Sequence, residues 1–538
     1  MRSATTTLWG CTLLAVLGCG GSGSNAPPSG GDDAGTANPP QVDGGTCGSD
    51  AGAPFSGTIQ FGGDTCVEQL AAGTFPFKPA CTLPHNPGFV AFGSPVGPAT
   101  APPTTTCFRP SKASALAQSA QTFCNRSVGT QLTFNVPPGT GSVTILSQAR
   151  ATQDAPLTIT GSDGGTCFQV TNSVAPTSVT DANARVLLDS AYSSGDPVDA
   201  GIYYGSLSES TGAMTFPDSA FLLDEVNKNG GLPGGAWTFS VDDLANDCHF
   251  FSNCSGGSAT GSYDVTVIAK PVAPVTGTVD VGFYLVETGG LTAASAVAAA
   301  QSSGTALGRM MKGLQTLYGN AGLCLGTVTF YDVPSWAQQR FSASIDADHT
   351  EPCSNLDQMF ALLSQPGNAL NFFLVSSISS SSQGGLTTVG LDGTIPGPST
   401  AGGTIDSGAA VSIADLTLTG CTGSTDYRNC GADSVAYITA HEGGHWLGLY
   451  HTVESTGDTF DSLSDTATCP CSSCRPASAS QQCGSDPMTS YQMSTLDCTA
   501  SAACGSGDNL MFWLIGAASR GTVSQQQQQV MRGNPVVQ

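Results

Sequence analysis

The chain has 538 residues, with 16 Lys and Arg against 40 Asp and Glu and a formal net charge of −24 at pH 7. This length exceeds what one hydrophobic core can organise, so we expect several domains. The acidic balance repels nucleic acid and anionic lipid, which excludes both as expected partners, and the 10% content of charged residues is typical of exported β-rich proteins.

The N-terminus has the pattern of an export signal. Arg2 is followed by an apolar run from Leu8 to Leu17, which is too short to span a membrane as a lasting helix. We therefore predict that residues 1–18 are a signal peptide. The four residues from Val16 to Cys19 resemble a bacterial lipobox, whose Cys is lipidated and becomes the new first residue; the alternative is an ordinary signal peptide that contains a Cys. The protein is thus expected to be exported, either secreted or anchored in the cell envelope through a lipidated Cys19.

Two segments of unusual composition follow the signal. Residues 19–46 consist mainly of Gly, Ser, Pro, Asn and Asp, so they cannot build a core and are predicted to be a disordered tether. Residues 47–125 are rich in Pro and Cys, which indicates a small disulfide-stapled module with little regular structure. Eighteen cysteines follow the signal, eight up to Cys254 and ten from Cys324, so each half can pair internally in an oxidising compartment.

Residues 126–272 show apolar residues at every second position between turn residues. This spacing predicts an antiparallel β-sandwich, resembling a jelly roll and the accessory sandwiches of secreted proteases. The predicted strands are Leu132–Val136, Ser142–Leu146, Ala184–Leu188, Ala236–Ser240 and Tyr263–Ile268. Asp242 and Asp243 could bind Ca²⁺ there, and an exposed turn explains them equally well.

Residues 278–538, after a linker at 271–277, are predicted to form an α/β (α+β) domain. Strands and helices alternate in this part, which favours a twisted sheet with helices packed against it. The expected elements are a strand at Asp280–Glu287, a long helix at Thr292–Leu317, a strand at Leu325–Val333, a short helix at Asn355–Ser364 and a strand at Ala369–Ser377. The chain is therefore expected to be multidomain.

The chemistry is concentrated in His441-Glu-Gly-Gly-His445-Trp-Leu-Gly-Leu-Tyr-His451, which holds three of the chain's six histidines. On a predicted helix from Ala432 to Leu449, His441 and His445 lie four residues apart and can bind one Zn²⁺ from the same face. Gly448 can adopt the left-handed conformation that ends a helix. The chain can then turn back and bring His451 in as a third ligand.

Three protein ligands leave the fourth position open for water. Glu442 follows the first ligand, where its carboxylate can take a proton from that water and later deliver it to a leaving amine. Chance would produce the eleven-residue pattern in roughly one such sequence in a million. A structural zinc site is the alternative, but it would fill the fourth position with Cys or His and would not use the glutamate.

The motif resembles the metzincin metallopeptidases, and most closely their pappalysin family. Thr452 follows the third histidine, and Gly457–Asp458 and Ser464–Thr466 come after it, similar to the family's HT…GD…DT segment. Ala467 stands where the family has Pro. The resemblance implies a zinc peptidase fold, and it places an edge strand for substrate at Gly384–Ile395, where an ordinary surface hairpin is the alternative.

The residues Asp508–Met511 resemble the metzincin Met-turn. The resemblance implies that Met511 forms an apolar support beneath the zinc histidines; the alternative is ordinary core packing. Phe512 and Trp513 depart from the family, which has a Tyr two residues after this Met.

The segment around the Met-turn contains two further patterns. Asp458, Asp461 and Asp465 could bind Ca²⁺, as the resemblance implies, or could be solvated loop acids. The cluster Cys469–Cys474 favours disulfides over a second zinc site in an oxidising compartment. A last helix is predicted to begin with Thr522 as its cap and Gln525 as its third residue, with its five glutamines on the surface.

The function expected from these patterns is a zinc-dependent endopeptidase that acts on protein or peptide substrates. His441, His445 and His451 are the metal ligands and Glu442 is the general base. One alternative is an envelope-anchored binding or adhesion lipoprotein with a vestigial peptidase. Another is a zinc hydrolase that acts on substrates other than peptides.

Overall fold

The computed structural model describes residues 58–61, 119–127, 129–149, 157–161, 166–170, 174–189, 211–243, 254–255, 262–273, 275–302, 304–333, 338, 341, 344–346, 355–360, 369–379, 389–393, 395–398, 408–421, 426–486, 489–501 and 503–538. The expected signal peptide, Cys19, the tether and most of the Cys- and Pro-rich module lie outside these residues. Within them, no helix combines the length and the apolar character needed to cross a membrane.

Strands dominate the first half and helices the second. The strands are β1 (Thr58–Phe61), β2 (Ser119–Ser127), β3 (Leu132–Val136), β4 (Thr140–Ala149), β5 (Leu157–Gly161), β6 (Thr166–Val170), β7 (Val174–Thr180), β8 (Val186–Asp189), β9 (Thr211–Phe216), β10 (Gly235–Asp243), β11 (Cys254–Ser255), β12 (Ser262–Pro271), β13 (Gly277–Leu285), β14 (Leu323–Asp332), β15 (Ile345–Asp346), β16 (Ala369–Val375), β17 (Ile378–Ser379), β18 (Gly390–Asp392) and β19 (Ala409–Ser412). The helices are α3 (Ala220–Asn229), α4 (Ala293–Ala300), α5 (Ala306–Asn320), α7 (Asn355–Phe360), α8 (Gly431–Trp446), α9 (Cys471–Cys474) and α10 (Gln525–Gly533), with short 3-10 helices η4 (Tyr427–Asn429) and η5 (Asp497–Thr499).

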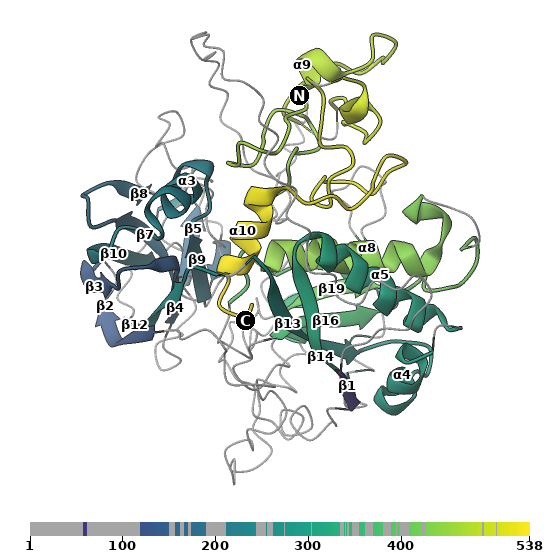
Figure 1. Ribbon diagram of the computed structural model, residues 1–538, viewed down its shortest axis with the longest axis horizontal. Helices are drawn as coiled ribbons and strands as arrows, with labels where there is room; N and C mark the ends of the chain where they lie inside the picture. The colour runs from purple at the N-terminus through teal and green to yellow at the C-terminus, as the bar shows by residue number, and fades with distance from the viewer. Residues whose placement is uncertain are drawn as a thin grey trace, which may run out of the picture.

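A six-stranded mixed sheet with helices on its faces forms the second half, as the α/β prediction requires. Its order is β1-β14-β13-β16-β19-β18, with β18 antiparallel to β19 and the other pairs parallel. Alternate residues of β13 face opposite sides: Phe283 packs with α4, α5 and α8, and Tyr284 packs with α7. The helix that carries the histidine motif therefore lies on one face of the sheet, next to α5 (Figure 1).

The predicted long helix at Thr292–Leu317 is wrong as a single element. The structure breaks it into α4 and α5, because Thr305 caps a new helix by accepting a hydrogen bond from the Gly308 amide at 3.0 Å. Thr292 caps α4 in the same way. Each cap accepts from backbone amides that have no partner in the first turn of a helix. The segment therefore forms two helices where the apolar spacing predicted one.

Two four-stranded antiparallel sheets face each other across one hydrophobic core in the first half. Their orders are β3-β10-β7-β8 and β2-β12-β4-β9, and Phe134 and Trp237 of one sheet share the core with Ile145 and Val267 of the other. All five predicted strands fall on observed strands, displaced or extended at their ends. Asp242 and Asp243 end β10, where they pair with β7, so they do not form the expected turn.

Two elements come from the segment predicted to have little regular structure. Thr58–Phe61 forms β1, parallel to β14 at the edge of the six-stranded sheet. Ser119–Ser127 forms β2, which pairs with β12, so the antiparallel sheet begins before residue 126. The division into domains stays a prediction.

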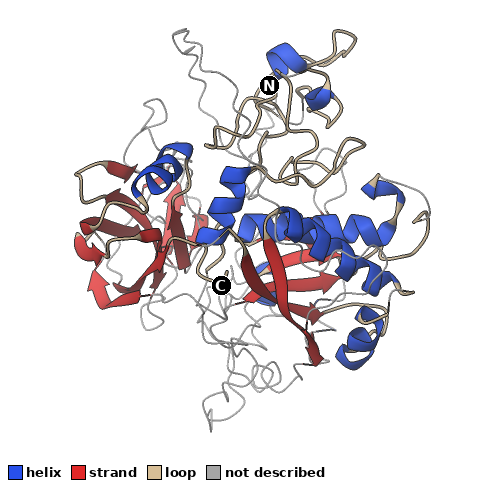
Figure 2. Ribbon diagram, in the orientation of Figure 1, coloured by secondary structure: helices blue, strands red, loops and turns tan. Residues whose placement is uncertain are grey.

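The C-terminal segment joins the two groups of strands. Figure 2 shows helix α10 between them. Lys270, at the end of β12, is 1% exposed and its Nζ donates to the carbonyls of Arg532 at 2.5 Å, Asn534 at 3.0 Å and Val537 at 2.5 Å. Gln538 pairs with Thr278 at the start of β13. The tail therefore contacts β12 of the antiparallel strands and β13 of the mixed sheet.

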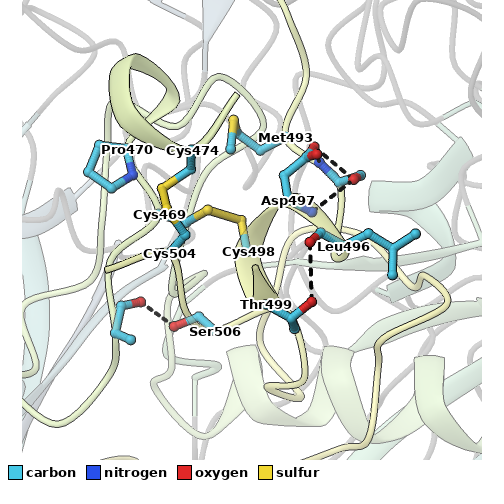
Figure 3. The surroundings of a disulfide bond; sticks show 12 residues. Cys469, Pro470, Cys474, Met493, Leu496, Asp497, Cys498, Thr499, Cys504 and Ser506 are labelled. Carbon is cyan, nitrogen blue, oxygen red and sulfur yellow. Dashed lines mark hydrogen bonds between the residues drawn. A yellow bond between two sulfur atoms is a disulfide. The ribbon is translucent and has the colours of Figure 1, made fainter. Parts of the chain in front are cut away.

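Disulfides organise the long segment between the histidine motif and the predicted Met-turn. Cys469 pairs with Cys498 and Cys474 with Cys504 (Figure 3). Cys471 pairs with Cys483, and the three pairs confirm disulfides rather than a thiolate metal site in this cluster. The sulfur atoms pack with Val453 and Phe512 in a small core of their own. A further disulfide, Cys421–Cys430, precedes α8.

Candidate metal centre

Helix α8 and the turn after it position the three histidines. His441 and His445 project from the last turns of α8, and Leu447 ends the helix. Gly448 then adopts φ 105°, a conformation that favours glycine, and its amide donates to His445 O at 2.8 Å. The chain turns back at this point, as the sequence predicts, and brings His451 beside the two helical histidines.

The three imidazoles converge through their Nε2 atoms. The distance is 3.2 Å from His441 to His451, 3.2 Å from His445 to His441, and 3.1 Å from His445 to His451. An ion bound at about 2.0–2.1 Å by three corners of a tetrahedron keeps these corners roughly 3.3 Å apart. The triad therefore could hold a metal ion of this size.

The second ring nitrogen of each histidine has its own acceptor. His441 Nδ1 lies 2.7 Å from Leu510 O, and His445 Nδ1 lies 2.7 Å from Leu449 O. Because a carbonyl only accepts hydrogen bonds, Nδ1 of His441 and of His445 carries the proton. The Nε2 atom of both rings therefore keeps its lone pair. Burial, assisted by the neighbouring His451, lowers the pKa of His441 to about 3 and that of His445 well below its usual value, so both rings are neutral.

Glu442 lies in a buried position against the edge of the sheet. Its side chain is 7% exposed, and the backbone of Asp392 in β18 donates a hydrogen bond to it. Burial raises the pKa of the Glu442 carboxyl to about 8, and the Asp392 hydrogen bond opposes this rise. A Cβ on Gly390 would collide with the Glu442 carboxylate. Strand β18 and the glutamate are therefore in direct contact.

The two residues between Glu442 and His445 are glycines that permit close packing. A side chain on Gly443 would meet the Tyr318 hydroxyl of α5, and one on Gly444 would meet the sulfur of Met511. Two adjacent glycines inside a helix are a sequence signal of such close approach.

The Asp508–Met511 segment packs under α8. Met511 is fully buried with its sulfur against Gly444, and the neighbouring carbonyl of Leu510 accepts from His441. The Met511 amide donates to Asn509 Oδ1 at 2.8 Å, and the Met511 carbonyl accepts from the Thr452 amide at 3.0 Å. The segment thus contacts both the helix and the loop that carries His451. Phe512 is buried with the disulfides, and the Trp513 indole donates to Met493 O.

The three acids considered for Ca²⁺ do not converge on a common point. Asp458 accepts from Thr456 and Thr459, and Asp461 accepts from Thr466. Asp465 lies at the start of α10 and accepts hydrogen bonds from the Ser524 hydroxyl at 2.6 Å and the Gln526 amide at 2.8 Å. Each carboxylate has a separate local role in this loop.

Sequence reasoning missed two polar residues at the site. Glu454 lies 3.2 Å from His451 Nδ1 through each carboxylate oxygen. Gln527 is fully buried, although it was expected on the helix surface, and it exchanges hydrogen bonds with Asn509. The three-residue spacing from His451 to Glu454 was a usable signal. The burial of Gln527 depends on tertiary packing.

Comparison with known proteins adds no family name to this geometry. Neither a scan against protein-family models nor a search of curated proteins gave a match to this chain.

Proposed function

We propose that this protein is a zinc-dependent endopeptidase of the metzincin type, most similar to the pappalysins, exported as a lipoprotein or secreted. One observation carries the proposal: three Nε2 atoms lie within 3.1–3.2 Å of one another, with Glu442 directly after the first ligand. A purely structural metal site would not need this glutamate. The disulfides suit an oxidising compartment.

The residues suit Zn²⁺ because three imidazoles at these separations match its preferred ligands and geometry. A bound zinc ion would supply Lewis-acid polarisation of a carbonyl and would lower the pKa of a water molecule toward neutrality. Glu442 would accept the proton of that water and deliver it to the amine that leaves. Its buried position favours this role, since a raised pKa lets a carboxyl both accept and release a proton near neutral pH.

Strand β18 offers a place for an extended peptide. It ends the order of the six-stranded sheet and pairs with β19. Because its residues Gly390 and Asp392 contact Glu442, a peptide added along this strand would pass beside the base. This position supports peptides rather than small esters as substrates. The described strand, Gly390–Asp392, is shorter than the expected Gly384–Ile395.

The decisive variant is Glu442→Gln. We expect it to bind zinc as the parent does and to lose at least about a thousandfold of its cleavage of casein or gelatin, because the amide cannot accept the proton. Phenanthroline should abolish the parent activity, and added Zn²⁺ should restore it. The matched control is Glu287→Gln, two residues after the end of β13, which should cleave at the parent rate.

Two results would contradict the proposal. One is undiminished turnover by Glu442→Gln, and the other is parent activity that resists the chelator.

A further inference from the structure

The outer nitrogen of His451 has a different type of partner from those of the other two histidines. His441 and His445 donate to the backbone carbonyls of Leu510 and Leu449, whereas His451 Nδ1 faces both oxygens of Glu454 at 3.2 Å. The His451 side chain is 2% exposed and that of Glu454 is 16% exposed. The carboxylate is therefore close to the site while it keeps some contact with solvent.

The backbone around Glu454 is fixed by a tight turn. The Glu454 amide donates to Thr459 O at 3.0 Å, and the Glu454 carbonyl accepts from the Gly457 amide at 2.9 Å. Gly457 adopts φ 65°, and a Cβ there would lie 2.8 Å from both Cys471 N and Met493 Cγ, so the turn is packed against the disulfide-bonded segment. The carboxylate thus approaches His451 from a rigid support.

His451 needs such a partner more than the other ligands do. The two helical histidines are oriented by α8 itself, whereas His451 lies on the loop beyond Gly448. A carboxylate that accepts the Nδ1 proton fixes the ring orientation, leaves the Nε2 lone pair for the metal and raises ligand basicity. It also places a carboxylate next to a ligand set made up of three imidazoles.

We propose that Glu454 is a positioning residue of the metal centre, which orients His451 by accepting its Nδ1 proton and strengthens metal binding through its charge. This inference rests on the proposed zinc site but not on peptide hydrolysis. It concerns the affinity for the ion, so it can be measured without a substrate.

The test compares Zn²⁺ affinity in the parent, Glu454→Ala and Glu454→Gln by competition with a chelating indicator. Removing an outer partner of a metal-bound histidine costs about 10–100-fold in affinity, and we expect a loss in this range for Ala. Gln keeps an acceptor oxygen without the charge, so we expect roughly a tenfold loss. The matched control is Asp458→Asn, an exposed acid on the same loop, which should bind zinc like the parent.

A spectroscopic measurement separates positioning from general loosening. The visible absorption of the Co²⁺-substituted protein reports ligand orientation, and we expect it to change in Glu454→Ala and to return toward the parent spectrum in Glu454→Gln. Parent-like zinc affinity in the Ala variant, or in the Gln variant if Ala does not fold, would overturn the inference. A parent that binds no zinc would overturn both proposals. A parent that binds zinc but cleaves no peptide would overturn the peptidase alone.

Discussion

At the scale of single residues, Glu442, the proposed general base, depends on a position that has no side chain. Gly390 lies against the Glu442 carboxylate, and the backbone of Asp392 donates to the same group. The Glu442 carboxylate therefore lies between α8, which carries it, and the backbone of β18. No sequence motif marks this contact, because β19 and η4 lie between β18 and α8 in the chain.

Gly390→Ala is expected to displace the base while the metal ligands stay in place. Because a displacement of about 1 Å in catalytic geometry can cost a hundredfold, we expect kcat to fall by roughly 10–100-fold with zinc affinity unchanged. The matched control is Gly319→Ala in α5, where a Cβ has no atom within 4 Å. Steady-state kinetics and zinc titration of both variants check this, and parent kcat in Gly390→Ala would show that the strand does not position the base.

At the scale of elements, the sequence predicted the helix, the convergence of its two histidines with His451 and, by resemblance, Met511 against that helix. It did not predict the contacts of Glu442 with β18 or of His451 with Glu454. The four-residue and six-residue spacings of His441, His445 and His451 and the glycine at 448 act through local geometry, and the structure has both features as expected. The last helix was placed two residues early, because Thr522 is occupied beside the Met511 turn: its carbonyl accepts from Leu510. Ser524 caps the helix instead, with Gln527 in the role assigned to Gln525. Contacts between distant segments decide such details, and a single sequence does not contain them.

The loop after α8 carries a buried acid that should make stability depend on pH. Burial raises the pKa of Asp461 from 3.8 to about 7, while the Thr466 hydrogen bond opposes this rise. The folded protein therefore holds more protons than the unfolded chain between about pH 4 and pH 7, and the contribution of Asp461 to stability is lost as the pH rises through this range.

Asp461→Asn should remove this dependence. We expect the free energy of unfolding of the variant, relative to the parent, to increase steadily from pH 4 to pH 7. Urea unfolding at several pH values measures the difference. A difference that stays constant across the range would mean that Asp461 titrates alike in the folded and unfolded chain.

At the scale of the whole molecule, the ammonium of Lys270 connects the antiparallel strands to the C-terminal tail. Lys270→Met should lower the free energy of unfolding by about 3–5 kcal/mol, because three buried carbonyls lose their donor. The control is Lys228→Met, whose ammonium is exposed in α3 and whose loss should change stability by less than about 0.5 kcal/mol. If chemical denaturation shows that Lys270→Met and Lys228→Met change the free energy of unfolding equally, the tail is held by other contacts.

The three disulfides in the segment after His451 affect when the candidate metal site can form. They form the interior of the segment that supports Glu454, Thr452 and thus His451, and reduced thiols would leave that interior loose. In a reduced chain, His441 and His445 would still be positioned by α8, whereas the loop that carries His451 would not be held in place. Oxidation of these cysteines would therefore be needed before His451 is held beside the other two histidines.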